Sequence, residues 1–136
     1  MTLMKTGDRL LDIFQDETLE RLDNIEDGLL KLEDCGPDCS PELVNSIFRD
    51  AHSIKAGSNL LKLARIEELS HKLENVLELI RSEGLVPTEL ITTASLEAVD
   101  KLRVLSEDLL NSDTKSIRLQ KTMLEVAVQR ALAGVE

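Results

Sequence analysis

The stretch DRLLDIFQDETLERLDNIEDGLLKLE, residues 8–33, decides the fold class of this chain. Its apolar side chains recur every three or four residues, a spacing that gathers them on one face of an α-helix. That face consists of Leu11, Phe14, Leu22, Ile25, Leu29 and Leu32, with Thr18 in the one gap. The stretch is therefore predicted to form one long amphipathic helix that must bury its apolar face against other elements.

The rest of the chain repeats this pattern between short polar breaks. Ser40 and Pro41 are suited to begin a helix, as N-cap and first helical residue, and Gly84 is suited to end one in a left-handed conformation. The expected helices span residues 8–33, 41–59, 64–83, 88–110 and 114–133. No segment alternates with a period of two. We therefore predict an all-α fold, an antiparallel four-helix bundle with an additional fifth C-terminal helix, in a single domain over residues 1–136.

Composition supports this fold class and excludes several kinds of partner. Aromatic residues make up only 1% of the 136 residues, which suits a helical core of aliphatic side chains better than a sheet. The net charge of −10 repels nucleic acid and anionic lipid. No apolar run approaches the roughly 20 residues of a membrane span, and no apolar segment of a signal peptide follows the N-terminus. We expect a cytoplasmic protein with no nucleic-acid partner and no membrane insertion.

The two cysteines, Cys35 and Cys39, lie in the short segment between the first two expected helices. A metal site would need further ligands nearby, and none is evident in the sequence. We predict two free thiols in a loop and no metal. An adventitious disulfide, or a metal acquired during handling, is the alternative.

His52 is predicted to stand at the edge of the buried face of the second helix. At 100° per residue it lies about 110° from the apolar centre of that helix, where solvent can reach it. Phe48, one turn earlier, is expected in the core, and Lys55 lies beside His52 on the same face. Small residues surround them and could form a flat docking patch for another protein: Ser53, Ala56, Gly57 and Asn59. From spacing alone, a fraying helix end explains Ala56 and Gly57 equally well.

On the third helix, His71 and Glu74 are three residues apart and share one side. If the second and third helices are neighbours, these residues can face His52 and Lys55. A carboxylate on one imidazole nitrogen fixes the tautomer and leaves the other nitrogen unprotonated, which activates it as a nucleophile. Lys55 could then pair with the oxygens of a phosphoryl group. Without further information, two ordinary solvated histidines remain the more common case.

Two segments resemble a known family. Phe48-Arg49-Asp50-Ala51-His52-Ser53-Ile54-Lys55-Ala56-Gly57 is similar to the phosphorylation motif of histidine phosphotransfer (HPt) domains. It is most similar to that of the N-terminal domain of CheA-type chemotaxis kinases, with the pattern A-H-S-I-K-G-G. His71-Lys72-Leu73-Glu74-Asn75 looks like the H-x-x-E-N of the family's third helix. The chain departs from the pattern at Ala56, where the family usually has glycine.

The resemblance implies a role for each of these residues. His52 is expected to accept a phosphoryl group from the catalytic domain of a histidine kinase and to donate it to an aspartate of a response-regulator receiver domain. Glu74 would orient and activate His52, Lys55 would balance phosphoryl charge, and His71 would complete the polar network. No cofactor is expected, and a monomer is the default. The resemblance fits a stand-alone carrier and a fragment of a larger kinase equally well, in chemotaxis or in another phosphorelay.

Two other classes of function remain open at this stage. A metal-binding bundle is disfavoured because the chain lacks the paired Glu-x-x-His motifs of di-iron bundles. A non-catalytic helical adaptor is compatible with the apolar periodicity, and it would bind its partner without any dependence on His52.

Overall fold

A computed structural model describes residues 3–134 as a bundle of helices joined by short connections. Its elements are α1 (Arg9–Cys35), η1 (Gly36–Asp38), α2 (Pro41–Leu60), α3 (Ala64–Glu83), α4 (Glu89–Glu107), η2 (Leu109–Thr114) and α5 (Arg118–Leu132). Between residues 3 and 134 there is no strand, only an isolated bridge between Met4 and Asp108. The prediction of an all-α fold is confirmed.

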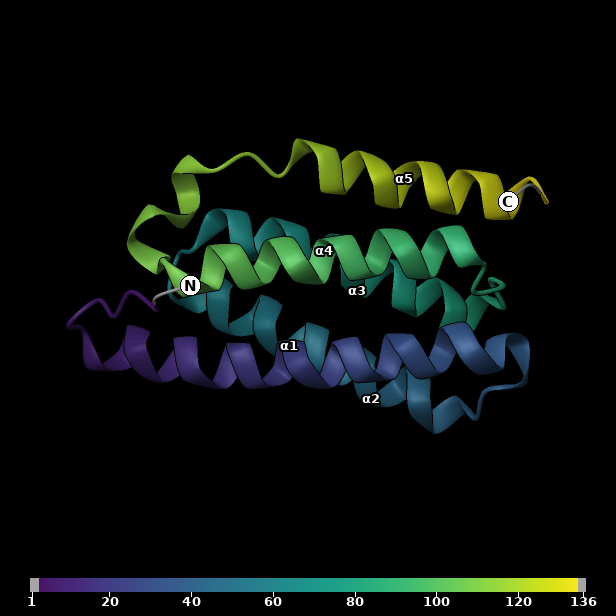
Figure 1. Cartoon of the computed structure of the whole chain (residues 1–136), viewed down its shortest axis with the longest axis horizontal. Helices are drawn as coiled ribbons and strands as arrows, with labels where there is room; N and C mark the ends of the chain where they lie inside the picture. The colour runs from purple at the N-terminus through teal and green to yellow at the C-terminus, as the bar shows by residue number, and fades with distance from the viewer. Residues whose placement is uncertain (1–2, 135–136) are drawn as a thin grey trace.

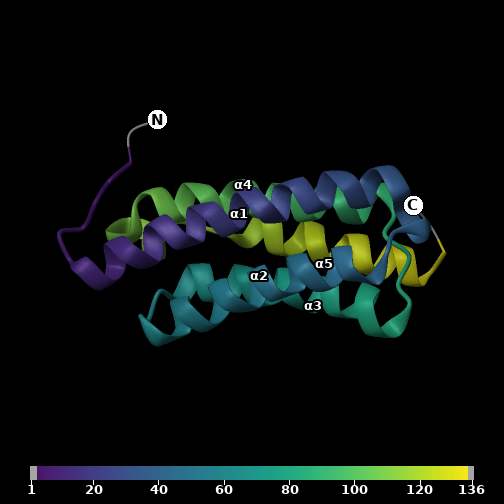
Figure 2. The same ribbon diagram turned by 90° about the horizontal axis from the view of Figure 1, so that it is seen from below.

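The first four helices form two packed pairs, and the fifth lies outside them. Figure 1 shows α1 beside α4, with α5 running along the far side of α4. Figure 2, turned by 90°, shows α2 and α3 together as a second layer beneath α1 and α4. Short links between successive helices force each to run antiparallel to the one before it. This is the predicted four-helix bundle with an added C-terminal helix, in which α5 packs on α3 and α4 and leaves α2 uncovered.

The core is aliphatic, as the composition predicted. Leucine, isoleucine, valine and alanine side chains from all five α-helices are buried together. On α1, the predicted apolar face is buried from Leu22 onward, whereas Leu11 and Phe14 are only partly covered. On α5, Leu124 and Ala127 face inward, but Leu132, which follows them on the same helix, is exposed. The geometry explains the difference, because eight residues after Leu124 a helix has turned about 80° away from the same face.

The helix boundaries agree with the sequence except around α4 and α5. Helix α3 has the predicted bounds, and Gly84 ends it with a φ of +71°. Helix α4 stops at Glu107, and a 3₁₀ segment follows where the sequence predicted helix up to residue 110 and again from 114. This tighter turn keeps Leu109 and Ser112 buried, with the Ser112 hydroxyl donating to the Leu109 carbonyl at 2.8 Å. At the start of α2, Ser40 takes the N-cap position, although its hydroxyl makes no capping hydrogen bond.

The prediction of two free thiols is wrong, because Cys35 and Cys39 form a disulfide. Helix α1 ends at Cys35, and Gly36 follows with a φ of +55°, a conformation that suits glycine. The chain then makes the short η1 turn, which folds Cys39 back until the two Cα atoms are 5.2 Å apart. That separation lies within the range that a disulfide spans. Sequence spacing alone could not reveal it, because it depends on where α1 stops.

Gly28 lies where α1 packs tightly against α2. A Cβ atom at this position would overlap the Cγ2 methyl group of Ile47, a buried β-branched side chain with little freedom to move. Gly28→Ala should lower the free energy of unfolding by about 1–3 kcal/mol, measured by urea denaturation, because overpacking outweighs the gain in helix propensity.

Gly57→Ala is the matched control for this substitution. There the added Cβ would lie 2.8 Å from Cε1 of Phe14, whose partly exposed ring can swing aside, so the loss should be smaller. Equal stability of Gly28→Ala and the wild type would contradict the close approach of the two helices.

None of the helices formed by residues 3–134 combines the length and the apolar character needed to cross a membrane.

Candidate functional site

The candidate site lies where α2 and α3 run antiparallel, in a register that places His52 opposite Glu74. Nδ1 of His52 is hydrogen-bonded to Oε2 of Glu74. Nζ of Lys55 donates to the other carboxylate oxygen, Oε1, at 2.7 Å. Two turns further along both helices, Nδ2 of Asn59 donates to Oε2 of Glu67 at 2.6 Å, which extends the register of His52 and Glu74. Three of the four residues predicted to form a polar cluster are therefore in contact across the two helices.

These three side chains differ greatly in burial. Glu74 is 6% exposed, whereas the side chain of His52 is 56% exposed. Lys55 is intermediate. The carboxylate of Glu74 thus forms the buried part of the cluster, and the imidazole of His52 forms the part in contact with solvent.

The hydrogen bonds keep Glu74 ionised. Burial by itself would raise the pKa of this carboxyl group, but the hydrogen bonds from Lys55 and His52 outweigh burial and hold the pKa below its ordinary value. An ionised carboxylate can only accept hydrogen bonds, so Nδ1 of His52 carries the proton and donates it. In the neutral imidazole, Nε2 then holds a free lone pair, and no residue between 3 and 134 forms a hydrogen bond with it. In its neutral form, His52 therefore presents one oriented, unprotonated nitrogen to solvent.

A shallow hollow of about 270 Å³ adjoins His52 and is lined by Phe48, His52, Glu74, Asn75 and Glu78. The Phe48 ring stacks on the imidazole with their centres 6.2 Å apart and their planes 15° from parallel. Phe48 was expected in the core, yet it is only partly buried and contacts the candidate nucleophile. Its position four residues before His52 was a signal in the sequence that it shares the face of His52.

His71 is exposed on α3, one turn before Glu74. Within the part of the chain that the structure describes, it forms no hydrogen bond or ion pair with His52, Lys55 or Glu74. Its place in the polar network remains a prediction.

The predicted docking residues divide into two groups. Ser53, Ala56 and Asn59 are exposed beside His52. Gly57 instead faces α1, where its missing side chain makes room for the ring of Phe14. The helix does not fray here, because α2 continues to Leu60. A fraying end therefore does not account for Ala56 and Gly57.

The structure offers no metal-binding site among residues 3–134. No group of three or more His, Cys, Asp or Glu side chains lies close enough together there to hold a metal ion.

Known proteins similar to this chain include members of one domain family and chemotaxis proteins. The family model described as "Hpt domain" matches residues 9–128. The chain is 38% identical over 91 residues to the chemotaxis protein CheA of Rhizobium meliloti, which covers 67% of this chain and 12% of that protein. It is 35% identical over 130 residues to the gliding motility regulatory protein of Myxococcus xanthus, covering 92% of this chain and 16% of that protein. The chain thus spans less than a fifth of the length of these relatives.

Among solved structures, the fold is similar to the phosphorylated P1 domain of CheA3 in complex with CheY6 from R. sphaeroides. The TM-score is 0.78 at 25% sequence identity, and the match covers 90% of this chain and 97% of that one.

Proposed function

Because the chain belongs to the Hpt domain family, we propose that it is a phosphoryl carrier in which Nε2 of His52 accepts and then donates the group. The observation that carries this proposal is the pairing of an exposed imidazole with a buried, ionised carboxylate. That pairing fixes the proton on Nδ1 and leaves Nε2 free to attack phosphorus.

The proposed transfer consists of two displacements at phosphorus. In the first, the Nε2 lone pair forms a bond to the γ-phosphorus of ATP, and the bond to the bridging oxygen breaks, with its electron pair leaving on ADP. In the second, a carboxylate oxygen of the receiving aspartate attacks, and the N–P pair returns to Nε2. The Nδ1 proton stays hydrogen-bonded to Glu74 throughout, and that carboxylate balances the positive charge that the ring acquires. Lys55 supplies positive charge near the phosphoryl oxygens.

The partners proposed for this domain are the catalytic domain of a histidine kinase and a response-regulator receiver domain. The complex of the similar P1 domain with CheY6 supports the second partner, and the CheA relatives support the first. We place the domain in a chemotaxis-type two-component pathway in the cytoplasm, where ATP and both partners are found. ATP binding and Mg²⁺ belong to the kinase partner, which is either a separate protein or another part of the same polypeptide.

The exposed patch formed by Ser53, Ala56 and Asn59 is the proposed docking surface for the receiver domain. Ala56→Trp places a bulky side chain at its centre. Loaded with phosphoramidate, this variant should accept the phosphoryl group normally, because a small donor needs no docking surface. Its transfer to a CheY-type receiver domain should slow about tenfold or more, since displacement of the partner spoils alignment at phosphorus.

Thr93→Trp is the matched control, because Thr93 is exposed on α4, away from His52. Transfer is followed by the disappearance of the acid-labile phosphohistidine. Unchanged transfer from Ala56→Trp would remove the docking patch from the proposal, and a wild-type chain that never loads would remove the carrier function itself.

A further inference from the structure

The imidazole of His52 has a second restraint besides its hydrogen bond to Glu74. One hydrogen bond at Nδ1 fixes one ring atom and leaves the plane of a largely exposed ring free to turn. The Phe48 ring, one turn earlier on α2, lies nearly parallel to the imidazole, with 6.2 Å between the ring centres. Aromatic rings at this separation attract one another. Phe48 therefore limits how far the imidazole can rotate.

Phe48 is held in its turn from the neighbouring helix. The guanidinium carbon of Arg81, on α3, lies 4.0 Å from the centre of the Phe48 ring. This is a cation–π contact, and arginine is the residue that most often makes one. Phe48 is only partly buried, so the core does not contact its ring on every side. Arg81 covers part of the ring surface that the core does not contact.

Arg81 is fixed by Glu78, one turn earlier on α3. Nε of Arg81 donates to Oε1 of Glu78 at 3.0 Å, and Nη2 donates to Oε2 at 2.8 Å. The hydroxyl of Ser82 also donates to Oε1, at 2.6 Å. The hydrogen bonds from Arg81 and Ser82 lower the pKa of Glu78 to about 2. The carboxylate is therefore ionised at neutral pH and stays paired with Arg81.

We propose that Phe48 and Arg81 are positioning residues for His52: the line of contacts from Glu78 through Arg81 and Phe48 holds the imidazole plane so that Nε2 faces the incoming phosphorus. This inference rests on the phosphoryl-accepting role proposed for His52. Attack on phosphorus requires the entering and leaving atoms to be in line, so a looser ring reacts more slowly although no reacting atom is lost. Arg81 acts through Phe48, so its effect depends on the phenyl ring being present.

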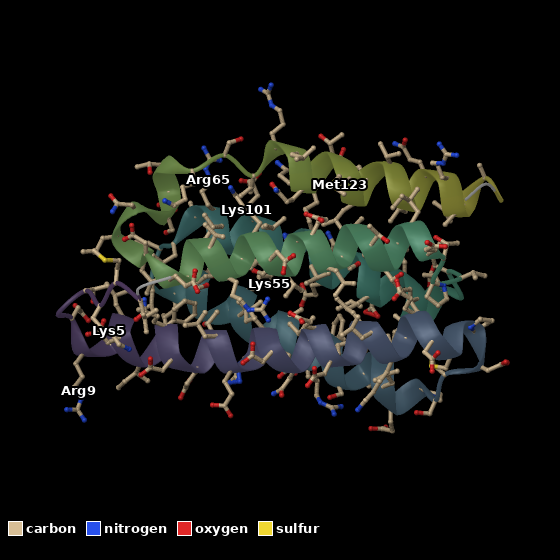
Figure 3. The ribbon with its side chains drawn as sticks, viewed as in Figure 1. Lys5, Arg9, Lys55, Arg65, Lys101 and Met123 are labelled. Atoms are coloured by element: carbon tan, nitrogen blue, oxygen red, sulfur yellow. A yellow bond between two sulfur atoms is a disulfide. The ribbon has the colours of Figure 1, made fainter. Side chains whose placement is uncertain are left out.

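The test compares Phe48→Leu, Arg81→Gln and the double variant Phe48→Leu/Arg81→Gln. Arg9→Gln is the matched control, since it also removes one arginine charge, and Figure 3 shows Arg9 at the far end of α1, pointing away from the bundle. Each protein is loaded with phosphoramidate, which avoids any effect on kinase docking. Each single variant should load about 3- to 10-fold more slowly than the wild type, as expected for loss of one aromatic or cation–π contact. The double variant should be no slower than Phe48→Leu.

Proton NMR of the imidazole distinguishes a positioning role of Phe48 and Arg81 from a role in overall stability, because the chemical shift of the ring reports its immediate surroundings. The Hδ2 signal of His52 should shift in Phe48→Leu, as the ring current of the phenyl group is lost, and should broaden or shift in Arg81→Gln. It should not change in Arg9→Gln. Because the chain has only two histidines, His71→Gln assigns the signals.

Wild-type loading rates in both single variants would overturn the inference and leave the carrier function intact. So would a double variant whose loss equals the product of the two single losses, because Arg81 would then act independently of Phe48. If Phe48→Leu loses helical content by circular dichroism, the loading rate of Arg81→Gln, a substitution at an exposed position, decides whether the inference holds. A wild-type protein that does not load would refute the carrier function, while the NMR signals would still report whether Phe48 and Arg81 hold the ring.

Discussion

His52→Gln should accept no phosphoryl group, whereas His71→Gln should load at close to the wild-type rate. The chain has only these two histidines, and both are exposed on helices. Only His52 has a carboxylate on Nδ1 that fixes the tautomer and frees Nε2. Glutamine has no ring nitrogen to form the N–P bond, so the loss should be complete. His71 forms no hydrogen bond or ion pair with the three clustered residues, so we expect His71→Gln to change the rate within about twofold, and a larger loss would support the predicted place of His71 in the polar network.

The measurement is incorporation of label from phosphoramidate, or from ATP with the catalytic domain of a CheA kinase, together with circular dichroism. Helical content should survive His52→Gln, because the replaced side chain is largely exposed and the new amide can still donate to Glu74. A His52→Gln protein that labels as fast as the wild type would show that the acceptor is another residue.

Glu74→Ala is expected to slow phosphorylation about 10- to 100-fold, by analogy with the loss typical when the carboxylate partner of a metal-ligating histidine is removed. The substitution removes both the hydrogen bond that fixes the tautomer and the charge that balances the phosphorylated ring. Glu74→Gln should fall between Glu74→Ala and the wild type, because its amide oxygen can still accept from Nδ1 but carries no charge. The comparison therefore separates orientation of the ring from stabilisation of its charge.

Glu97→Gln is the control for Glu74→Gln, because Glu97 is exposed on α4. The substitution removes the same charge at a distance from the site. Rates are measured with phosphoramidate at a fixed pH, and folding is checked by thermal melting. If Glu74→Ala and the wild type load equally fast, the carboxylate does not activate His52, whatever its contact with the imidazole.

The sequence predicted well the features that depend on local periodicity. The buried part of the predicted face of α1, from Leu22 onward, follows from spacing, and the end of α3 at Gly84 follows from the conformational freedom of glycine. The contact between His52 and Glu74 needed more than spacing, because it depends on α2 and α3 being neighbours. The resemblance to HPt domains supplied that knowledge.

The remaining features depend on how helices pack or where they stop. Asn111-Ser112-Asp113 signals a break in the helix, but it does not distinguish a loop from the 3₁₀ turn that buries Leu109. The Cys35–Cys39 disulfide depends on the end of α1. The contact of Arg81 with Phe48 depends on the register between α2 and α3, which no local pattern in either helix contains.

The placement of α5 has a consequence for the timing of the proposed relay. Because α5 lies along α3 and α4, the surface around Nε2 of His52 is left open, yet it offers only one nitrogen on one side of the bundle. Donor and recipient must reach the same atom from the same direction, so they exclude each other. Each cycle then requires one protein to leave before the next arrives, and an excess of recipient would compete with the donor for access and delay reloading.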